Sequence, residues 1–97
     1  MPSSKEFLDF VLTQLSALPD ITYRAMMGEY IIYYRGKIIG GIYDNRFLFK
    51  PTATAQKIIT NATLEIPYPG AKPMLMIPDI KNTELLIKLF NAMYGEL

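Results

Sequence analysis

The chain has 97 residues and a mass of 11.1 kDa, which is enough for one small domain. It contains no histidine, cysteine or tryptophan, and this excludes disulfides, thiolate zinc sites, cysteine nucleophiles and imidazole-based triads. Any metal site would have to use oxygen ligands. The residues are 51% hydrophobic and 20% charged with a net charge of +1, so a core can form, and the charge gives no strong field for duplex nucleic acid.

We expect no targeting signal at the beginning of the chain. Residues 1–18 include Lys5, Glu6 and Asp9 and lack a long apolar stretch, unlike a signal peptide. No window of the sequence approaches the roughly 20 apolar residues of a membrane helix. We therefore expect a cytoplasmic protein without membrane contacts.

The first predicted element is a helix over residues 4–17. Ser3 and Glu6 have the spacing of a capping box. Apolar residues then recur at helical intervals, at Phe7, Leu8, Val11, Leu12, Leu15 and Leu18. Pro19-Asp20 ends the helix, because proline cannot continue it.

A meander of four strands is predicted next, over 21–27, 30–34, 37–43 and 46–50, which are rich in Ile, Tyr and Phe. Arg35-Gly36 and Asp44-Asn45 have the length and residue types of two-residue hairpin loops. These loops set a register in which Tyr34 faces Lys37, Ile32 faces Ile39, Tyr43 faces Arg46 and Gly41 faces Leu48.

This register sorts the meander into two faces. The uncharged one is the predicted core face: Ile31, Tyr33, Ile38, Gly40, Ile42, Phe47 and Phe49. The other mixes aromatic, aliphatic and basic residues and is the predicted interaction face: Tyr30, Ile32, Tyr34, Lys37, Ile39, Gly41, Tyr43, Arg46, Leu48 and Lys50. Three interpretations of it stay open: a protein interface or self-association, a face covered by loops or simply solvated, and a surface on which cations and tyrosines bind nucleic acid.

The last third alternates short elements. Thr52 or Thr54 can cap a helix over about 53–60, an extended piece is predicted over 64–66, and a turn at Pro69-Gly70 leads to a strand over 74–77. Asp79 or Asn82 can cap a final helix with the apolar stripe Leu85, Leu86, Leu89, Phe90 and Met93, closed by Gly95. The hairpins force antiparallel pairing. The predicted fold is therefore an α+β two-layer sandwich with helices on one face of the sheet.

No constellation of catalytic, cofactor-binding or metal-binding residues stands out. The acids are scattered over helix ends, turns and surfaces. Gly40-Gly41 lies inside a strand, which favours close packing or a bulge over a phosphate loop. Arg24 would bind an anion if buried, but a structural pair with Glu29 or a charge at a strand edge is the simpler interpretation. The methionines Met26, Met27, Met74, Met76 and Met93 are predicted to be core filler.

One run of residues resembles a known family. Residues 24–33, Arg-Ala-Met-Met-Gly-Glu-Tyr-Ile-Ile-Tyr, are followed by Gly36-Lys37 and by Phe47-Leu48-Phe49-Lys50. This pattern is similar to that of the N-terminal domain of the TfoX/Sxy competence regulators, with Met27 where that family usually has Phe. The motif residues are Arg24, Met26, Gly28 and Tyr33, and the resemblance extends over nearly the whole chain as a single domain, 1–97.

The resemblance implies an α-β(3)-α-β(2)-α fold, similar to secretion chaperones, in which the first two strands merge into one bent strand around Gly28. It implies a non-enzymatic regulatory module of DNA transformation, with no cofactor. Together with the predicted interaction face, it leads us to expect action through protein contacts and self-association as a homodimer. The alternative function is that of a small nucleic-acid-binding domain, similar to YjbR-type domains, using Lys37, Arg46 and Lys50.

Overall fold

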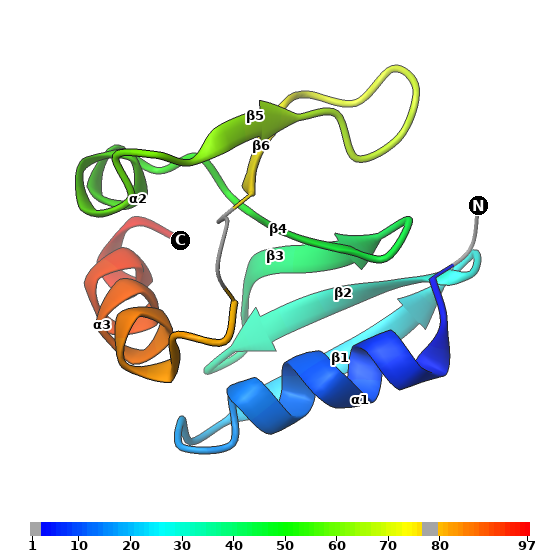
Figure 1. Ribbon diagram of the computed structural model, residues 1–97, viewed down its shortest axis with the longest axis horizontal. Coiled ribbons are helices and arrows are strands. Elements are labelled where there is room, and N and C mark those ends of the chain that lie inside the picture. Colours follow the sequence, from blue (N-terminus) through cyan, green and yellow to red (C-terminus); the bar gives the residue numbers. More distant parts are fainter. Residues whose placement is uncertain (1–2, 77–79) are drawn as a thin grey trace.

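The computed structural model describes residues 3–76 and 80–97 (Figure 1). In this part of the chain the helices are α1 (Lys5–Gln14), α2 (Ala53–Ile58) and α3 (Thr83–Met93), the last continued by the 3-10 turn η1 (Tyr94–Glu96). The strands are β1 (Ile21–Met26), β2 (Glu29–Tyr34), β3 (Lys37–Tyr43), β4 (Arg46–Phe49), β5 (Thr63–Glu65) and β6 (Met74–Met76). Ile77 and Asp79, the predicted strand end and alternative helix cap, lie outside the described residues.

The strands form one antiparallel sheet in the order β1-β2-β3-β4-β6-β5. A single cluster of buried side chains joins one face of this sheet to all three helices. It includes Val11 of α1, Ala55 of α2 and Phe90 of α3, packed with Ile32 and Phe49 of the sheet. The predicted α+β two-layer sandwich with helices on one face is therefore confirmed.

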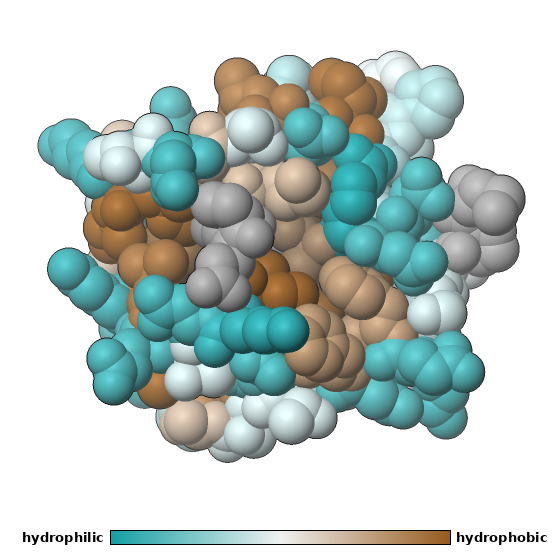
Figure 2. Space-filling view, in the orientation of Figure 1, coloured by the Kyte–Doolittle hydropathy of each residue, from teal (hydrophilic) through white to brown (hydrophobic). Residues whose placement is uncertain are grey.

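Apolar side chains remain visible at the surface of the helical side. In the orientation of Figure 1 they gather over β5 and over the end of the molecule that carries α2 and α3 (Figure 2). Leu64 of β5 is 63% exposed. Such scattered exposure is normal for a small domain, because the available polar surface cannot cover it.

Three tight hairpins build the meander, each with a two-residue loop in the left-handed region that suits the strand twist. The predicted loops Arg35-Gly36 and Asp44-Asn45 are confirmed, with φ of 52° and 81°, and of 53° and 56°. Met27-Gly28 forms a third, with φ of 53° and 85°. The merged bent strand implied by the resemblance is therefore wrong: β1 and β2 are separate strands, and four strands precede α2.

The register between β2 and β3 corrects the two predicted faces. Tyr34 faces Lys37 as predicted, but the pairing then shifts, so that Tyr33 faces Ile38 and Ile32 faces Gly40. This leaves Ile39 as an extra residue on β3, a β-bulge. A shift by one residue exchanges the faces, because side chains alternate along a strand.

The bulge moves the two faces relative to the prediction. Ile32, Tyr34 and Ile39, placed on the predicted interaction face, are at most 1% exposed and belong to the core. Ile31, Tyr33 and Ile38, placed on the predicted core face, lie outside this core cluster. Between β3 and β4 the predicted register holds, and Ile42, Phe47 and Phe49 are core residues as expected.

Gly40 and Gly41 lie where the backbones of neighbouring strands approach closely. A Cβ on Gly40 would lie 2.1 Å from the carbonyl oxygen of Leu48, and one on Gly41 would lie 2.8 Å from the carbonyl oxygen of Tyr30. Both positions therefore require glycine for a close approach of backbone to backbone. The prediction that these glycines serve close packing is confirmed.

The helix ends differ in detail from the predicted caps. Ser4, not Ser3, caps α1, because its hydroxyl oxygen accepts from the N–H of Phe7 at 3.1 Å. Thr52 and Asn82 cap α2 and α3 as two of the expected candidates. Gly95 does not close α3 with a left-handed residue; it lies inside the 3-10 turn that continues the helix.

Candidate interaction surface

The face of the sheet opposite the helices is uncovered over β1, β2 and β3. We call this surface the open face and define it by Thr22, Arg24, Met26, Glu29, Ile31, Tyr33 and Ile38. These residues alternate with those that face the core, and register pairs them across strands: Thr22 with Tyr33, Tyr33 with Ile38, and Arg24 with Ile31. Directly paired residues share a face, so Thr22, Tyr33 and Ile38 form a row across three strands.

Apolar side chains are accessible on the open face. Ile38 is 39% and Met26 42% exposed, and Ile31 and Tyr33 are half-buried. Arg24 is exposed and has no hydrogen bond or ion pair to any other described residue. The predicted pair between Arg24 and Glu29 is therefore wrong, and so is the buried arginine. The other prediction, a charge at a strand edge, is confirmed, because Arg24 is exposed on the edge strand β1. The result is an apolar surface with one unpaired cation.

Three of the four motif residues lie on this surface. Arg24, Met26 and Tyr33 belong to the open face, and Gly28 forms the turn that joins β1 to β2 with φ of 85°. The prediction that the methionines fill the core is wrong for Met26 and for its neighbour Met27, which is 97% exposed. It is confirmed for Met93, which belongs to the core cluster. The motif thus marks a surface-exposed hairpin.

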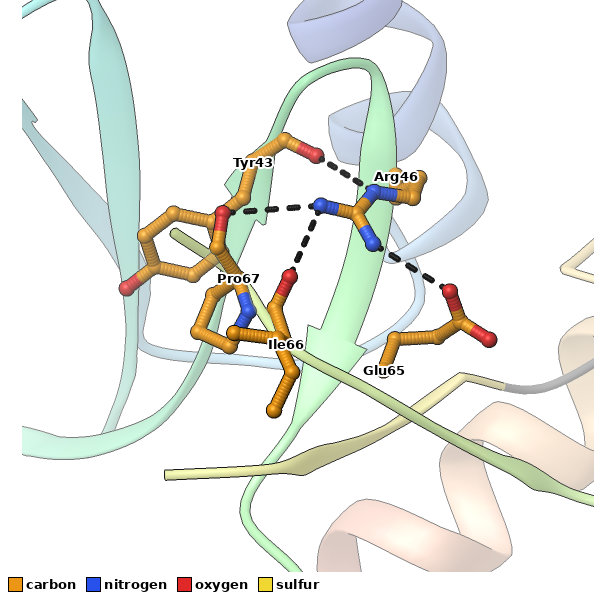
Figure 3. A network of polar contacts seen from close by, with 5 residues as sticks. All are labelled: Tyr43, Arg46, Glu65, Ile66 and Pro67. Carbon is orange, nitrogen blue, oxygen red and sulfur yellow. Dashed lines mark hydrogen bonds and ion pairs between the residues drawn. The ribbon is translucent and has the colours of Figure 1, made fainter. Parts of the chain in front are cut away.

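Over β4, the side of the sheet that faces away from the helices is covered by the segment that follows β5. Arg46 holds this segment through its guanidinium group (Figure 3). Its Nε donates to the carbonyl of Tyr43 at 3.2 Å, and Nη2 donates to the carbonyls of Ile66 and Pro67 at 3.1 and 3.4 Å. Nη1 lies 3.3 Å from Oε1 of Glu65. Arg46 therefore acts as a clamp between the β3–β4 hairpin and the segment after β5.

The ring of Tyr43, which lies under this segment, is removed from the accessible surface. Tyr43 is 9% exposed, and its ring centroid lies 5.9 Å from that of Tyr68. Burial raises the pKa of the Tyr43 hydroxyl, and the nearby Tyr68 and Glu29 raise it further. Leu48 is fully buried. For Tyr43, Arg46 and Leu48, the interpretation of a face covered by loops is the correct one.

The cations of the predicted interaction face do not share one surface. The Nζ of Lys37 lies 4.7 Å from the ring centroid of Tyr94, on the side of α3. Arg46 is engaged in the clamp, and Lys50 follows the end of β4, where its N–H donates to the carbonyl of Ile39 at 2.9 Å. Tyr30 packs against the core. The predicted array of cations between tyrosines is therefore not formed.

A depression of about 340 Å³ lies beside the clamp, lined by Glu29, Asp44, Arg46, Ile66, Pro67, Tyr68 and Pro69. The carboxylate of Glu29, one of its two acidic residues, accepts hydrogen bonds from backbone groups and from a hydroxyl. Oε1 of Glu29 accepts from the N–H and the hydroxyl of Ser3 at 2.8 and 2.7 Å, and Oε2 accepts from the N–H of Asp44 at 2.9 Å. Ser3 also accepts from the N–H of Asn45 through its hydroxyl oxygen. These bonds fasten the start of α1 to two hairpins.

Sequence reasoning missed both the clamp and the Glu29 network, since each joins segments far apart in the chain. Among residues 3–76 and 80–97, no three acidic side chains lie close enough together to hold a metal ion. None of the helices formed by these residues is both long and apolar enough to cross a membrane.

Comparison with known proteins places the chain. It is 32% identical over 80 residues to a protein from Spirochaeta aurantia described as an uncharacterized 12.7 kDa protein in the trpE 5′ region, and the match covers 82% of this chain and 70% of that protein. No solved structure matches the chain at a significant level. Residues 13–87 match the TfoX N-terminal domain, a span that includes every strand of the sheet, the motif hairpin and the beginning of α3. The chain belongs to the TfoX N-terminal domain family.

Proposed function

We propose that this domain is a non-enzymatic regulatory module that acts through protein contacts, and that the open face is its contact surface. The observation that carries the proposal is the accessible row of Thr22, Tyr33 and Ile38, with Arg24 beside it. Apolar and aromatic side chains with an arginine are the composition that protein interfaces favour. Three of the four motif residues, Arg24, Met26 and Tyr33, lie on this surface and not in the core.

Membership of the TfoX N-terminal domain family supports a regulatory role, and we propose that it concerns DNA transformation and transcription, as in the competence regulators that the sequence resembles. The relative from Spirochaeta aurantia adds no activity, because its own description is uncharacterized.

The engagement of the polar groups supports a non-enzymatic role. Glu29 and Arg46, which line the depression beside the clamp, use their charged atoms to hold backbone groups and Glu65. A general acid or base needs a free position next to the reacting group. Nucleic-acid binding stays an untested alternative, and the cations that suggested it lie at separate places.

The experiment compares capture of protein partners from native cells by the wild-type domain and by Ile38→Lys, which puts a charge into the exposed row. Leu64→Lys makes the same change at an exposed residue on β5, away from the open face. We expect Ile38→Lys to lose the partners that Leu64→Lys retains. Equal capture by all three proteins, with Ile38→Lys folded by circular dichroism, would contradict the proposal.

A further inference from the structure

Strand β1 is one of the two edges of the sheet, and its outer side pairs with none of the described strands. Residues 22–26 are all exposed. The strand is six residues long, and its register with β2 is continuous, without a bulge. It contains no proline and no lysine. Natural sheets usually protect an exposed edge strand with a bulge, a proline or lysines, because its unpaired N–H and C=O groups are a template for another strand.

The register shows which backbone groups of β1 point outward. The N–H of Arg35 donates to the carbonyl of Asp20 at 3.0 Å, so this pair is hydrogen-bonded. Bonded and non-bonded pairs alternate in an antiparallel ladder, so Thr22, Arg24 and Met26 bond to β2. The N–H and C=O groups of Ile21, Tyr23 and Ala25 therefore face the free side, where no described residue binds them.

We propose that two copies of this chain associate by antiparallel pairing of β1 with β1, with the two-fold axis at Tyr23. In this register Ile21 pairs with Ala25 of the second copy and Tyr23 pairs with Tyr23. Each of these pairs exchanges two hydrogen bonds, and the two sheets become one. The inference rests on the proposed function in that self-association is one form of protein contact, but it uses the sheet edge instead of the open face.

Charge complementarity selects this register over its neighbours. An axis at Arg24 would place two arginines directly opposite each other, which destabilises a strand pair. An axis at Tyr23 instead places Thr22 opposite Arg24 and brings Asp20 of one copy to the diagonal position next to Arg24 of the other, within reach of its long side chain. Asp20 and Arg24 are both exposed and make no ion pair within the described chain.

Tyr23 adds apolar contact at the axis. Its side chain lies on the helix side of the sheet, 5.9 Å from Tyr30 between ring centroids, and is 47% exposed. Pairing across the two-fold axis brings the two Tyr23 rings together. A second copy therefore fits both the unpaired backbone groups and the exposed ring.

The test is sedimentation velocity of the full chain over a wide concentration range, and we expect a concentration-dependent dimer. Ala25→Pro removes an outward N–H without loss of a large side chain, and edge strands tolerate such a proline; this variant should stay monomeric while keeping its circular dichroism spectrum. Arg24→Glu should raise the dimer dissociation constant by about tenfold. Lys88→Glu, the same charge change at an exposed residue of α3, should leave the dimer dissociation constant unchanged.

Two results would overturn the inference: a wild-type chain that is monomeric at every concentration, or a folded Ala25→Pro variant that still dimerises like the wild type. The proposed function would survive either result, because it is tested separately by Ile38→Lys. A dimer lost in Ile38→Lys and retained in Ala25→Pro would assign self-association to the open face and overturn the edge pairing.

Discussion

Glu29 holds Ser3 by two hydrogen bonds to the same carboxylate oxygen, at 2.8 Å from the backbone N–H and 2.7 Å from the hydroxyl. The other carboxylate oxygen accepts from Asp44 at 2.9 Å. Residues 26 positions apart in sequence, at the start of a helix and at the start of a strand, are thereby fixed to a third segment, the β3–β4 turn. Ser3 is 8% exposed, so these bonds are partly shielded from water.

Removal of this carboxylate should destabilise the domain. We expect Glu29→Ala to lower the free energy of unfolding by about 1–3 kcal/mol, because hydrogen bonds to a charged group are lost and the Ser3 hydroxyl loses its acceptor, while the Ser3 N–H keeps its bond to the carbonyl of Gly28. Urea denaturation measures the change. Asp9→Ala, which removes an exposed acid from α1, should change stability by less than about 0.5 kcal/mol. Equal effects of the two substitutions would show that the network is not stabilising.

Gly40 gives a second prediction, because an added methyl group has no room there. The nearest atom to its Cβ would be a backbone oxygen at 2.1 Å, and backbone cannot move aside as a side chain can. We expect Gly40→Ala to cost about 1–3 kcal/mol or more. Gly95→Ala is the matched control, since nothing lies within 4 Å of its Cβ. Thermal unfolding of both variants compares them, and similar melting temperatures would contradict the close approach.

Local signals were sufficient to predict most of the fold. Two of the three hairpin loops, Arg35-Gly36 and Asp44-Asn45, are specified by adjacent residues, and the first and last helices by their apolar stripes. The two faces of β2 were assigned wrongly, because their assignment depends on the bulge at Ile39. That bulge lies next to Gly40, whose backbone closely approaches the Leu48 carbonyl, and a regular register does not predict it.

The candidate surface was predicted in part. Resemblance directed attention to the hairpin with Arg24, Met26 and Tyr33, and these residues do lie on the open face. Regular alternation of side chains along the strands predicts the surface on the wrong residues of β2, and it extends the surface over β4. There, Arg46 binds carbonyls 20 and 21 residues later in the chain. Contacts at such separation leave no pattern in a single sequence.

The clamp provides a third prediction. Lysine keeps the charge of Arg46 but cannot replace a planar group that donates in several fixed directions. We expect Arg46→Lys to lower the free energy of unfolding by about 0.5–1.5 kcal/mol, mainly from lost bonds to carbonyls, since the ion pair with Glu65 is partly exposed and screened by water.

Hydrogen exchange locates this effect of Arg46→Lys. Exchange should accelerate in residues 63–71 and stay unchanged in α1. Arg24→Lys, the same substitution at a residue without bonds to the described chain, should leave both regions unchanged. Acceleration spread evenly over the whole domain would argue against a local clamp.

Tyr43 gives a prediction about pH. Burial raises the pKa of its hydroxyl above the ordinary value, so the folded state keeps the proton at a pH where the unfolded chain releases it. The folded state then binds more protons, and its stability falls as pH rises above about 10, the ordinary tyrosine value.

Tyr43→Phe has no phenolic proton to release, so it should remove part of this loss of stability at high pH. Urea unfolding at neutral pH and at about pH 11 measures it. At neutral pH the comparison reports only the loss of the hydroxyl, which is the internal control. An equal loss of stability with pH in wild type and variant would show that the buried hydroxyl does not contribute to alkaline unfolding.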